Sequence, residues 1–388
     1  MTMEKTIGLK EKKRTARSRP SWLRRFNDWF HLWIGIAAGI PVIIICLTGC
    51  LLVFEPEITA MSRSWWNVEI PAGGQPLPPS ALREKVVAQL PGMQIRRLWY
   101  YGEGKAVKIT PDNSNSLLFA NPYTGKLLAM QDHEDVFHFI EEGHTNLWLP
   151  REIGHQVVSW VTAVFLILTI TGIVLWWPKK WNAREMKQAL TIQWKAKFKR
   201  VNYDLHNVLG FYSLLIALIM TLTGLIMGFQ FVNKTVMQML GAKPRSKEIS
   251  AIQPGPEAVP ATIEGRVDMI FKLVTTEMGE YNRDQISIHF PKDDAKSIYA
   301  CTDMHHGSWR ELNFDRNTLA LLSSSQTKVA EDTPAGWMRR SNYALHVGAI
   351  GGTLTKWVYF FASFICATLP VTGFIVWFGK QRKKPSRK

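Results

Sequence analysis

The chain contains four long apolar stretches from which charged side chains are almost absent. They are Phe26–Phe54, broken only by Asp28, then Ile153–Pro178, Leu205–Asn233, and Ser341–Gly379, broken only by Lys356. A helix needs about 20 apolar residues to cross a bilayer, and a soluble core helix of that length without charges is rare. The pattern therefore predicts four transmembrane helices, near 31–54, 155–177, 206–231 and 352–378.

Between these stretches the pattern changes to short helical and strand-like periods. The first intervening segment predicts a helix at Pro79–Leu90, strands at Arg97–Tyr101, Ala106–Thr110 and Leu117–Ala120, and a last strand after a turn at 121–126. The second predicts a helix at Ile263–Met278 and strands at Gln285–Phe290, Ser297–Thr302, Glu311–Phe314 and Leu319–Ser323. Each segment is expected to form a small α+β module.

The predicted fold class is thus a membrane protein with four transmembrane α-helices and two small α+β modules. Its expected parts are a basic N-terminus (1–30), helix 1 (31–54), module 1 (55–143), a lead-in with helix 2 (144–177), a loop (178–205), helix 3 (206–231), module 2 (232–343), a lead-in with helix 4 (344–378) and a tail (379–388).

The two halves of the chain repeat the same spacing. In spans 1 and 3, Gly35 and Gly210 follow His31 and His206 by four residues, and a Thr-Gly pair begins 17 residues after each histidine. Spans 2 and 4 both end in Thr-Gly followed by a Trp. Such repetition predicts an internal duplication of one unit, made of a span, a module and a second span. The Thr-Gly pairs suit close helix packing.

Charge then orients the predicted spans. Of the chain's 388 residues, 47 are Lys or Arg and 31 are Asp or Glu, which gives a net charge of +16. Segments 1–30, 178–205 and 379–388 together hold 23 basic against 5 acidic residues, whereas the remainder holds 24 against 26. By the positive-inside rule, both termini and the loop are cytoplasmic and the modules lie outside, which in a bacterium is the periplasm. The basic residues therefore point to membrane lipids as a partner and not to nucleic acid.

Tryptophans and the one charge inside span 4 fit this picture. The tryptophans near predicted span ends suit an interfacial belt; they are Trp22, Trp29, Trp33, Trp65, Trp66, Trp148, Trp176, Trp177, Trp181 and Trp377. Lys356 is expected to extend its ammonium group outward to the interface.

Histidines carry the candidate chemistry. His31 and His206 begin corresponding spans on the expected cytoplasmic side, and His144, His155 and His346 gather near the outer face. Two histidines at one level on facing helices can supply both axial ligands of a b-type haem. His31 lies 17 residues from Thr48, about 26 Å along a helix, so two haems are needed to cover both levels. Small residues that could admit a macrocycle line this seam: Gly35, Ala37, Ala38, Gly39, Gly210 and Ser213.

Other interpretations of these histidines stay open. An interfacial histidine is often a polar cap, and the same side chains could bind a bare metal ion or relay protons, although the spans offer no acidic partner apart from Asp28 and Asp204 at their edges. His155 competes with His144 for the outer ligand position. In module 2, His305, His306 and Trp309 are weaker candidates for substrate contacts, as are residues 132–135 with His138 after module 1; solvated loop residues are the favoured interpretation of both groups.

Several chemistries lack sequence support. The four cysteines, of which Cys301 alone lies outside the spans, exclude a disulfide framework, and Cys46, Cys50 and Cys366 suit packing. The sequence has no CxxCH motif for covalent haem, no P-loop and no GxGxxG motif.

At the histidine motifs the chain resembles the PepSY-associated transmembrane family over nearly its whole length. The similar segments are Trp29–Gly35 with Leu47–Gly49, His144–Leu147 with Gly154 and Trp176-Trp177, Leu205–Gly210, and Leu345–Gly348. The resemblance implies that the modules are PepSY-like. Several members of the family are inner-membrane ferric-siderophore reductases that contain haem b, which implies His31, His206, His144 and His346 as ligands. At the position of His155, members often have Arg.

We therefore expect a multi-pass oxidoreductase of the bacterial inner membrane, with two b haems. It would move electrons from an unidentified donor to a periplasmic acceptor, foremost a ferric siderophore, for iron uptake. Reduction loosens such a chelate because hard oxygen ligands hold Fe(III) better than Fe(II). One alternative is a PepSY protein that regulates or inhibits periplasmic peptidases without redox activity. A transporter is disfavoured because we expect no broken helices with charged midplane residues.

Overall fold

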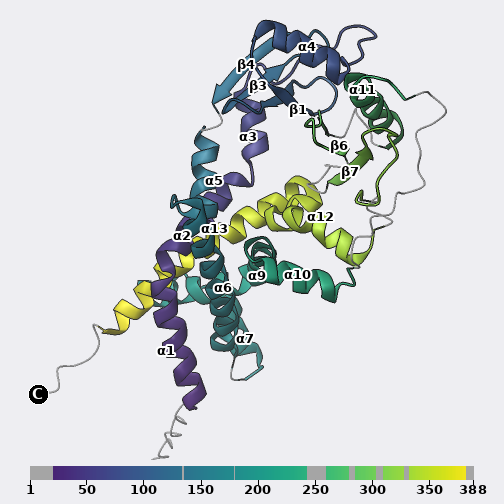
Figure 1. Cartoon of the computed structure of the whole chain (residues 1–388). Helices are drawn as coiled ribbons and strands as arrows, with labels where there is room; N and C mark the ends of the chain where they lie inside the picture. The colour runs from purple at the N-terminus through teal and green to yellow at the C-terminus, as the bar shows by residue number, and fades with distance from the viewer. Residues whose placement is uncertain are drawn as a thin grey trace, which may run out of the picture.

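The structure, a computed structural model, describes residues 21–132, 135–178, 180–242, 259–278, 285–302, 309–326 and 332–381. In these residues three helices are long and apolar enough to cross a membrane: Arg151–Trp176, Phe198–Gly228 and Ala349–Gly379. A fourth span is a bent pair, α1 (Trp22–Ala37) and α2 (Gly39–Leu52), whose axes differ by 63°. The chain is therefore a membrane protein that combines these helices with a β-sheet (Figure 1).

The spans depart from straight α-helices at two places. Pro41 has no N–H to bond to the Ala37 carbonyl, and Gly39 lies so close to Pro370 that a Cβ would stand 3.3 Å from it; both features favour the bend between α1 and α2. In the third span a π-helical turn, η1 (Leu205–Leu209), separates α8 (Phe198–Asp204) from α9 (Gly210–Gly228). Such turns occur often at functional sites, and this one contains His206.

Shorter helices surround the spans. They are α3 (Glu55–Ser62), α5 (Val136–Asn146), α7 (Ala183–Leu190), α10 (Gln230–Met239) and α12 (Pro334–Val347). The two remaining spans are α6 (Arg151–Trp176) and α13 (Gly352–Gln381), the latter preceded by the short turn η5 (Ala349–Gly351). Helix α5 packs on α2 and α6, and α12 packs on α9. Each of these two helices therefore brings a histidine from outside the spans against a spanning helix.

The two α+β segments share one sheet. The strands are β1 (Ile95–Tyr100), β2 (Val107–Pro111), β3 (Ser116–Ala120), β4 (Leu127–Asp132), β5 (Ile286–His289), β6 (Ser297–Thr302) and β7 (Arg310–Asp315). Their order in the sheet is β4-β3-β2-β1-β5-β6-β7, with antiparallel pairing throughout. Strands β1 and β5 join the segments, pairing Arg97 with His289 and Tyr100 with Ile286.

One hydrophobic core lies between this sheet and two helices. Helix α4 (Pro79–Gln89) contacts α11 (Ile263–Leu273), which continues into the π-helical turn η2 (Val274–Met278). Leu82 and Val86 of α4 and Val267 and Ile270 of α11 are buried in the same cluster as the inward side chains of the strands. The two predicted modules thus form one folded body.

The expected strand at Leu319–Ser323 is present only as short bridge pairing beside β7. Leu321 bridges Phe314, and main-chain hydrogen bonds of 2.8 Å run from Leu322 N to the Asn313 carbonyl and from Asp315 N to the Ala320 carbonyl. Leu319 has φ of 56°, a left-handed conformation that breaks an extended strand.

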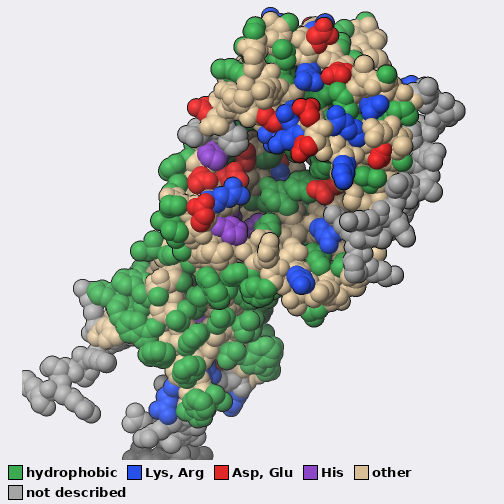
Figure 2. All heavy atoms as spheres, viewed as in Figure 1, with side chains coloured by type: hydrophobic (Ala, Val, Ile, Leu, Met, Phe, Trp, Pro, Cys, Tyr) green, Lys and Arg blue, Asp and Glu red, His purple; other side chains and the backbone are tan. Residues whose placement is uncertain are grey.

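Surface composition divides the molecule along its length. Figure 2 shows a hydrophobic belt below the sheet, with charged side chains concentrated on the sheet-bearing half. The first described helix and the end of α13 lie at the end away from the sheet, as does α7 (Figure 1). The basic segments predicted to be cytoplasmic adjoin these elements.

Side chains expected near the membrane boundary contact other parts of the protein. Trp65 and Trp66 pack on Phe119, at ring-centroid distances of 4.3 and 6.2 Å. Lys356 does not extend outward alone, because its Nζ lies 2.6 Å from Oε1 of Glu57 and its side chain is 14% exposed. The partner of this ammonium group is therefore the Glu57 carboxylate of α3, not the headgroup region.

Candidate functional site

Four histidines come together as two pairs. His31 of α1 faces His206 of η1, with ring centroids 6.4 Å apart and ring planes at 87°. His144 of α5 faces His346 of α12, at 6.2 Å and 63°. We call the first the basic-side pair and the second the sheet-side pair. Each pair takes one histidine from each of the two sequence repeats.

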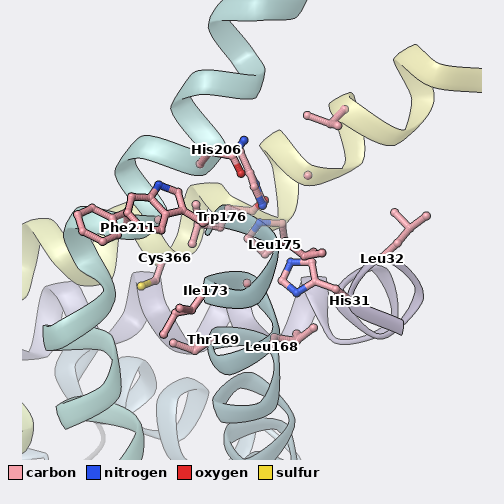
Figure 3. A pocket seen from close by; sticks show the side chains of 18 of the residues that line it. His31, Leu32, Leu168, Thr169, Ile173, Leu175, Trp176, His206, Phe211 and Cys366 are labelled. Carbon is pink, nitrogen blue, oxygen red and sulfur yellow. The ribbon is translucent and has the colours of Figure 1, made fainter. Parts of the chain in front are cut away.

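The basic-side pair lines a cavity of about 340 Å³ between α1, α6, α9 and α13. Figure 3 shows the rings of His31 and His206 reaching this cavity from different helices, together with Trp176 and Phe211. The rings of Trp176 and Phe211 stack at 3.9 Å. Among the predicted small residues, Gly35, Gly210 and Ser213 do line the cavity, whereas Ala38 packs in an apolar cluster with Val42 and Leu168. The space is mostly apolar and open to a flat, hydrophobic ligand.

A threonine hydroxyl supports each of the four imidazoles. The Nδ1–Oγ1 distances are 2.8 Å for His31 with Thr171, 3.0 Å for His206 with Thr372, 3.3 Å for His144 with Thr48 and 3.0 Å for His346 with Thr223. These are the threonines of the four Thr-Gly pairs. In every case the threonine belongs to the other span of the histidine's own repeat.

The hydrogen bonds fix which ring nitrogen carries the proton. Nδ1 of His206, His144 and His346 also lies 2.8–3.1 Å from the main-chain carbonyls of Leu369, Ile45 and Met220, which can only accept. The threonine hydroxyls donate to carbonyls in their own helices, as Thr223 does to Ile219 at 2.6 Å, and so accept from the rings. Nδ1 is therefore the donor, and Nε2 keeps a free lone pair. This is the arrangement found around metal-ligating histidines.

The glycine of each Thr-Gly pair makes room for the ring. A Cβ on these glycines would lie close to a histidine Cε1: 3.0 Å for Gly49 and His144, 3.2 Å for Gly373 and His206, and 3.4 Å for both Gly172 with His31 and Gly224 with His346. The Thr-Gly pairs therefore do more than allow the close helix packing predicted for them. Their glycines leave the space beside which the imidazole rings pack.

Burial keeps the sheet-side histidines neutral. Removal from solvent lowers the pKa of His144 and lowers that of His346 to about 4, with the neighbouring His144 as a second cause. A neutral imidazole is the form that binds a metal.

The donor set of each pair fits a haem. Imidazole nitrogens ligate metals at about 2 Å, so two rings that share one iron have centroids about 6 Å apart, as in both pairs. In the described residues no cluster of three or more His, Cys, Asp or Glu side chains suits a metal ion. A bare zinc or copper ion requires three or four protein ligands, whereas a haem brings its own four nitrogens. Arg24 at the cavity offers a cation for a haem propionate.

Two further candidates from the sequence, His155 and His138, belong to neither pair. His155 is half-buried on α6 and belongs to neither pair, so the structure favours His144 as the partner of His346. His138 lies by a polar cavity of about 410 Å³ with Arg97 and Asp112. Residues 133 and 134 and both His305 and His306 lie outside the described residues.

Trp309 is connected to the sheet-side pair. It stacks on Tyr343 with centroids 5.6 Å apart and planes at 21°. Tyr343 precedes His346 by three residues in α12, about one helical turn. Cys46, Cys50, Cys301 and Cys366 are all unbridged.

Sequence reasoning assigned the threonines to helix packing and missed their contact with the imidazoles. The signal was available, because every Thr-Gly pair has a corresponding histidine, but spacing alone could not show which threonine meets which ring.

No functionally curated protein matches the chain. The family described as the PepSY-associated TM region matches residues 29–380, which contain all four paired histidines and all four Thr-Gly pairs. The chain therefore belongs to the PepSY-associated transmembrane family.

Proposed function

We propose that the protein is a haem-containing oxidoreductase that moves electrons across the bacterial inner membrane. The observation that carries the proposal is the meeting of four histidines in two pairs, at ring separations of 6.4 and 6.2 Å, on opposite sides of the spanning region. His31 with His206 would hold one b haem, and His144 with His346 would hold the other.

The bound haems would supply one-electron redox chemistry. The protein's own groups prepare the ligands. The threonine hydroxyls accept from Nδ1 and so leave Nε2 of each ring free to ligate a metal, and the basic-side cavity has a largely apolar lining. The 17 residues between His31 and Thr48, which contacts His144, separate the levels of the pairs by at most about 26 Å of helix. Two sites divide the membrane crossing into shorter electron transfers.

Orientation and acceptor follow from charge and from the sheet-side surroundings. By the positive-inside rule, the distribution of basic segments supports a periplasmic sheet and cytoplasmic termini. Electrons from an unidentified donor would then leave at the sheet-side pair. A ferric siderophore is the acceptor proposed, because its oxygen-held Fe(III) is released on reduction. Trp309 and Tyr343 supply aromatic surface for such a molecule one turn from His346.

Charged groups near this exit suit a polar acceptor. Arg63 pairs with Asp135 at 3.1 Å and lies over the ring of Trp65. Burial raises the pKa of Glu55 and lowers that of Lys108, each of which lies within electrostatic range of the other. Arg63, Asp135, Glu55 and Lys108 thus bring both signs of charge together in one cluster.

The pairing also supports an origin by duplication. Each repeat contributes one histidine to each pair and supports its own histidines with its own threonines. Each proposed haem would thus lie at the interface of two equivalent units.

An absorption spectrum tests the proposal. Purified wild-type protein expressed with ample haem should show a Soret band that sharpens on dithionite reduction. His31→Ala and His346→Ala should each weaken it, whereas His155→Ala, on the neighbouring α6 and in neither pair, should leave it unchanged. A wild-type chain without a Soret band would contradict the proposal and favour the regulation of peptidases.

Substrate reduction needs its own experiment. Proteoliposomes with the sheet outside and a reductant trapped inside should reduce an external ferric hydroxamate, read as ferrous iron captured by ferrozine. Equal rates for wild type and for the His31→Ala variant would contradict electron transfer through the basic-side pair.

A further inference from the structure

Three of the four paired histidines are preceded by an asparagine at the same spacing. Asn27, Asn202 and Asn342 stand four residues before His31, His206 and His346. One helical turn separates such positions, so the amide and the imidazole project from the same side of the helix. Asn202 and Asn342 are 3% and 5% exposed, and Asn27 is half-buried.

Each amide donates to the threonine that supports the following histidine. The Nδ2–O distances are 3.1 Å from Asn27 to the Thr171 carbonyl, 2.9 Å from Asn202 to the Thr372 carbonyl and 3.1 Å from Asn342 to the Thr223 carbonyl. The same threonine accepts from the imidazole through its hydroxyl. Two side chains, one turn apart on one helix, thus contact two atoms of a single residue on another helix.

Two contacts, one from the amide and one from the imidazole, restrain the position of the histidine-bearing helix more than the imidazole contact alone. Hydrogen bonds that all come from the one atom Nδ1 let the histidine-bearing helix turn about that atom. A second contact, one turn away, fixes both the rotation and the height of that helix against the threonine. A buried threonine carbonyl has a second lone pair after its helical hydrogen bond, so the amide adds a contact without breaking one.

The fourth histidine lacks the second contact. Ile140 stands four residues before His144, and it has no group that can donate to Thr48. Nδ1 of His144 is held instead by the Ile45 carbonyl, at 2.8 Å, and by Thr48, at 3.3 Å. An asparagine contact therefore supports both imidazoles of the basic-side pair, but only one imidazole of the sheet-side pair.

We infer that Asn27, Asn202 and Asn342 are positioning residues for the haem ligands. The inference rests on the proposed function. It assigns to each asparagine an effect on one haem only: Asn27 and Asn202 act on the basic-side site, and Asn342 acts on the sheet-side site.

Electron paramagnetic resonance of the oxidised protein separates the two sites, because each low-spin haem gives its own signal set by ligand orientation. In Asn27→Leu the basic-side signal should shift while the sheet-side signal stays, and Asn342→Leu should do the reverse. Haem loss to apomyoglobin should accelerate about 10–100-fold at the affected site, the usual cost of removing a group that orients a ligand.

Two matched controls separate positioning from general packing. Ile140→Leu changes the equivalent position in the unit without a polar contact. Asn233→Leu removes an amide that donates to a helix carbonyl, that of Ile226 at 3.4 Å, away from the four histidines. Both should keep the two wild-type signals and the wild-type rate of haem loss.

The inference is overturned if Asn27→Leu and Asn342→Leu leave both signals unchanged, or if either variant shifts both signals equally. Asn202→Leu, at a nearly buried site, can fail to accumulate, and the half-buried Asn27 then tests the same pair. Absence of haem from wild type would instead refute the proposed function, so the two failures are distinguishable.

Discussion

A graded series of glycine substitutions follows from the walls beside the imidazoles. Alanine at Gly49 would place a Cβ 3.0 Å from Cε1 of His144, and at Gly373 it would stand 3.2 Å from Cε1 of His206. At Gly172 and Gly224 the distance is 3.4 Å, the edge of ordinary contact. Carbon atoms prefer separations of about 3.5–4.0 Å, so the ring has to move by about half an ångström in Gly49→Ala and by much less in Gly172→Ala.

Half an ångström is about the tolerance of a preorganised site. We therefore expect Gly49→Ala to weaken haem binding at the sheet-side pair about 10–100-fold. Gly373→Ala should have a smaller effect at the basic-side pair, and Gly172→Ala and Gly224→Ala should have the least. Alanine strengthens a helix relative to glycine by about 0.5–1 kcal/mol, so a loss of haem cannot be attributed to weaker helices.

The assay is the haem-to-protein ratio after dilution into detergent with a haem scavenger, with the two sites resolved by their resonance signals. Gly241→Ala, at a turn where φ is 81° and alanine is strained, destabilises the chain without adding a Cβ beside an imidazole, and it should leave haem retention unchanged. Equal haem retention in all four variants, or the reverse order, would refute the assignment of these glycines to ring placement.

Two further predictions concern stability. Glu57→Ala should lower the free energy of unfolding by about 1 kcal/mol, because it leaves the largely buried Lys356 without its carboxylate, and Lys356→Met in the same chain should restore it; equal thermal midpoints for the single and double variants would contradict this. Burial, aided by the charge of Arg97, lowers the pKa of His289 to about 4. The unfolded chain binds this proton near 6.5, so stability should be complete above pH 6.5 and fall as the pH drops toward 4. In His289→Gln that part of the pH dependence should disappear from melting curves; an unchanged slope would contradict it.

The pairing of the histidines was accessible from sequence because it depends on periodic features. The repeated spacing from His31 and His206 to their Thr-Gly pairs placed the two at one level, and long uncharged runs placed the spans. The structure brings these two rings together. Short-range sequence patterns likewise predicted the seven strands β1 to β7 to within a few residues.

What sequence could not provide depends on contacts between distant segments. Nothing in the strand pattern indicates that β1 pairs with β5 and merges two modules into one sheet. The choice between His144 and His155 depends on how α5 packs on α2, and the partner of Lys356 lies 299 residues away. The three asparagines share a repeated Asn-x-x-x-His spacing that the sequence shows. Their acceptors are main-chain carbonyls, which a sequence pattern cannot identify.

Haem stoichiometry is the most direct test of the central claim. A pyridine haemochrome assay on purified protein should give two haems per chain for wild type, one each for His206→Ala and His346→Ala, and none for the double variant. A wild-type value near zero, or a value that neither substitution changes, would contradict the account.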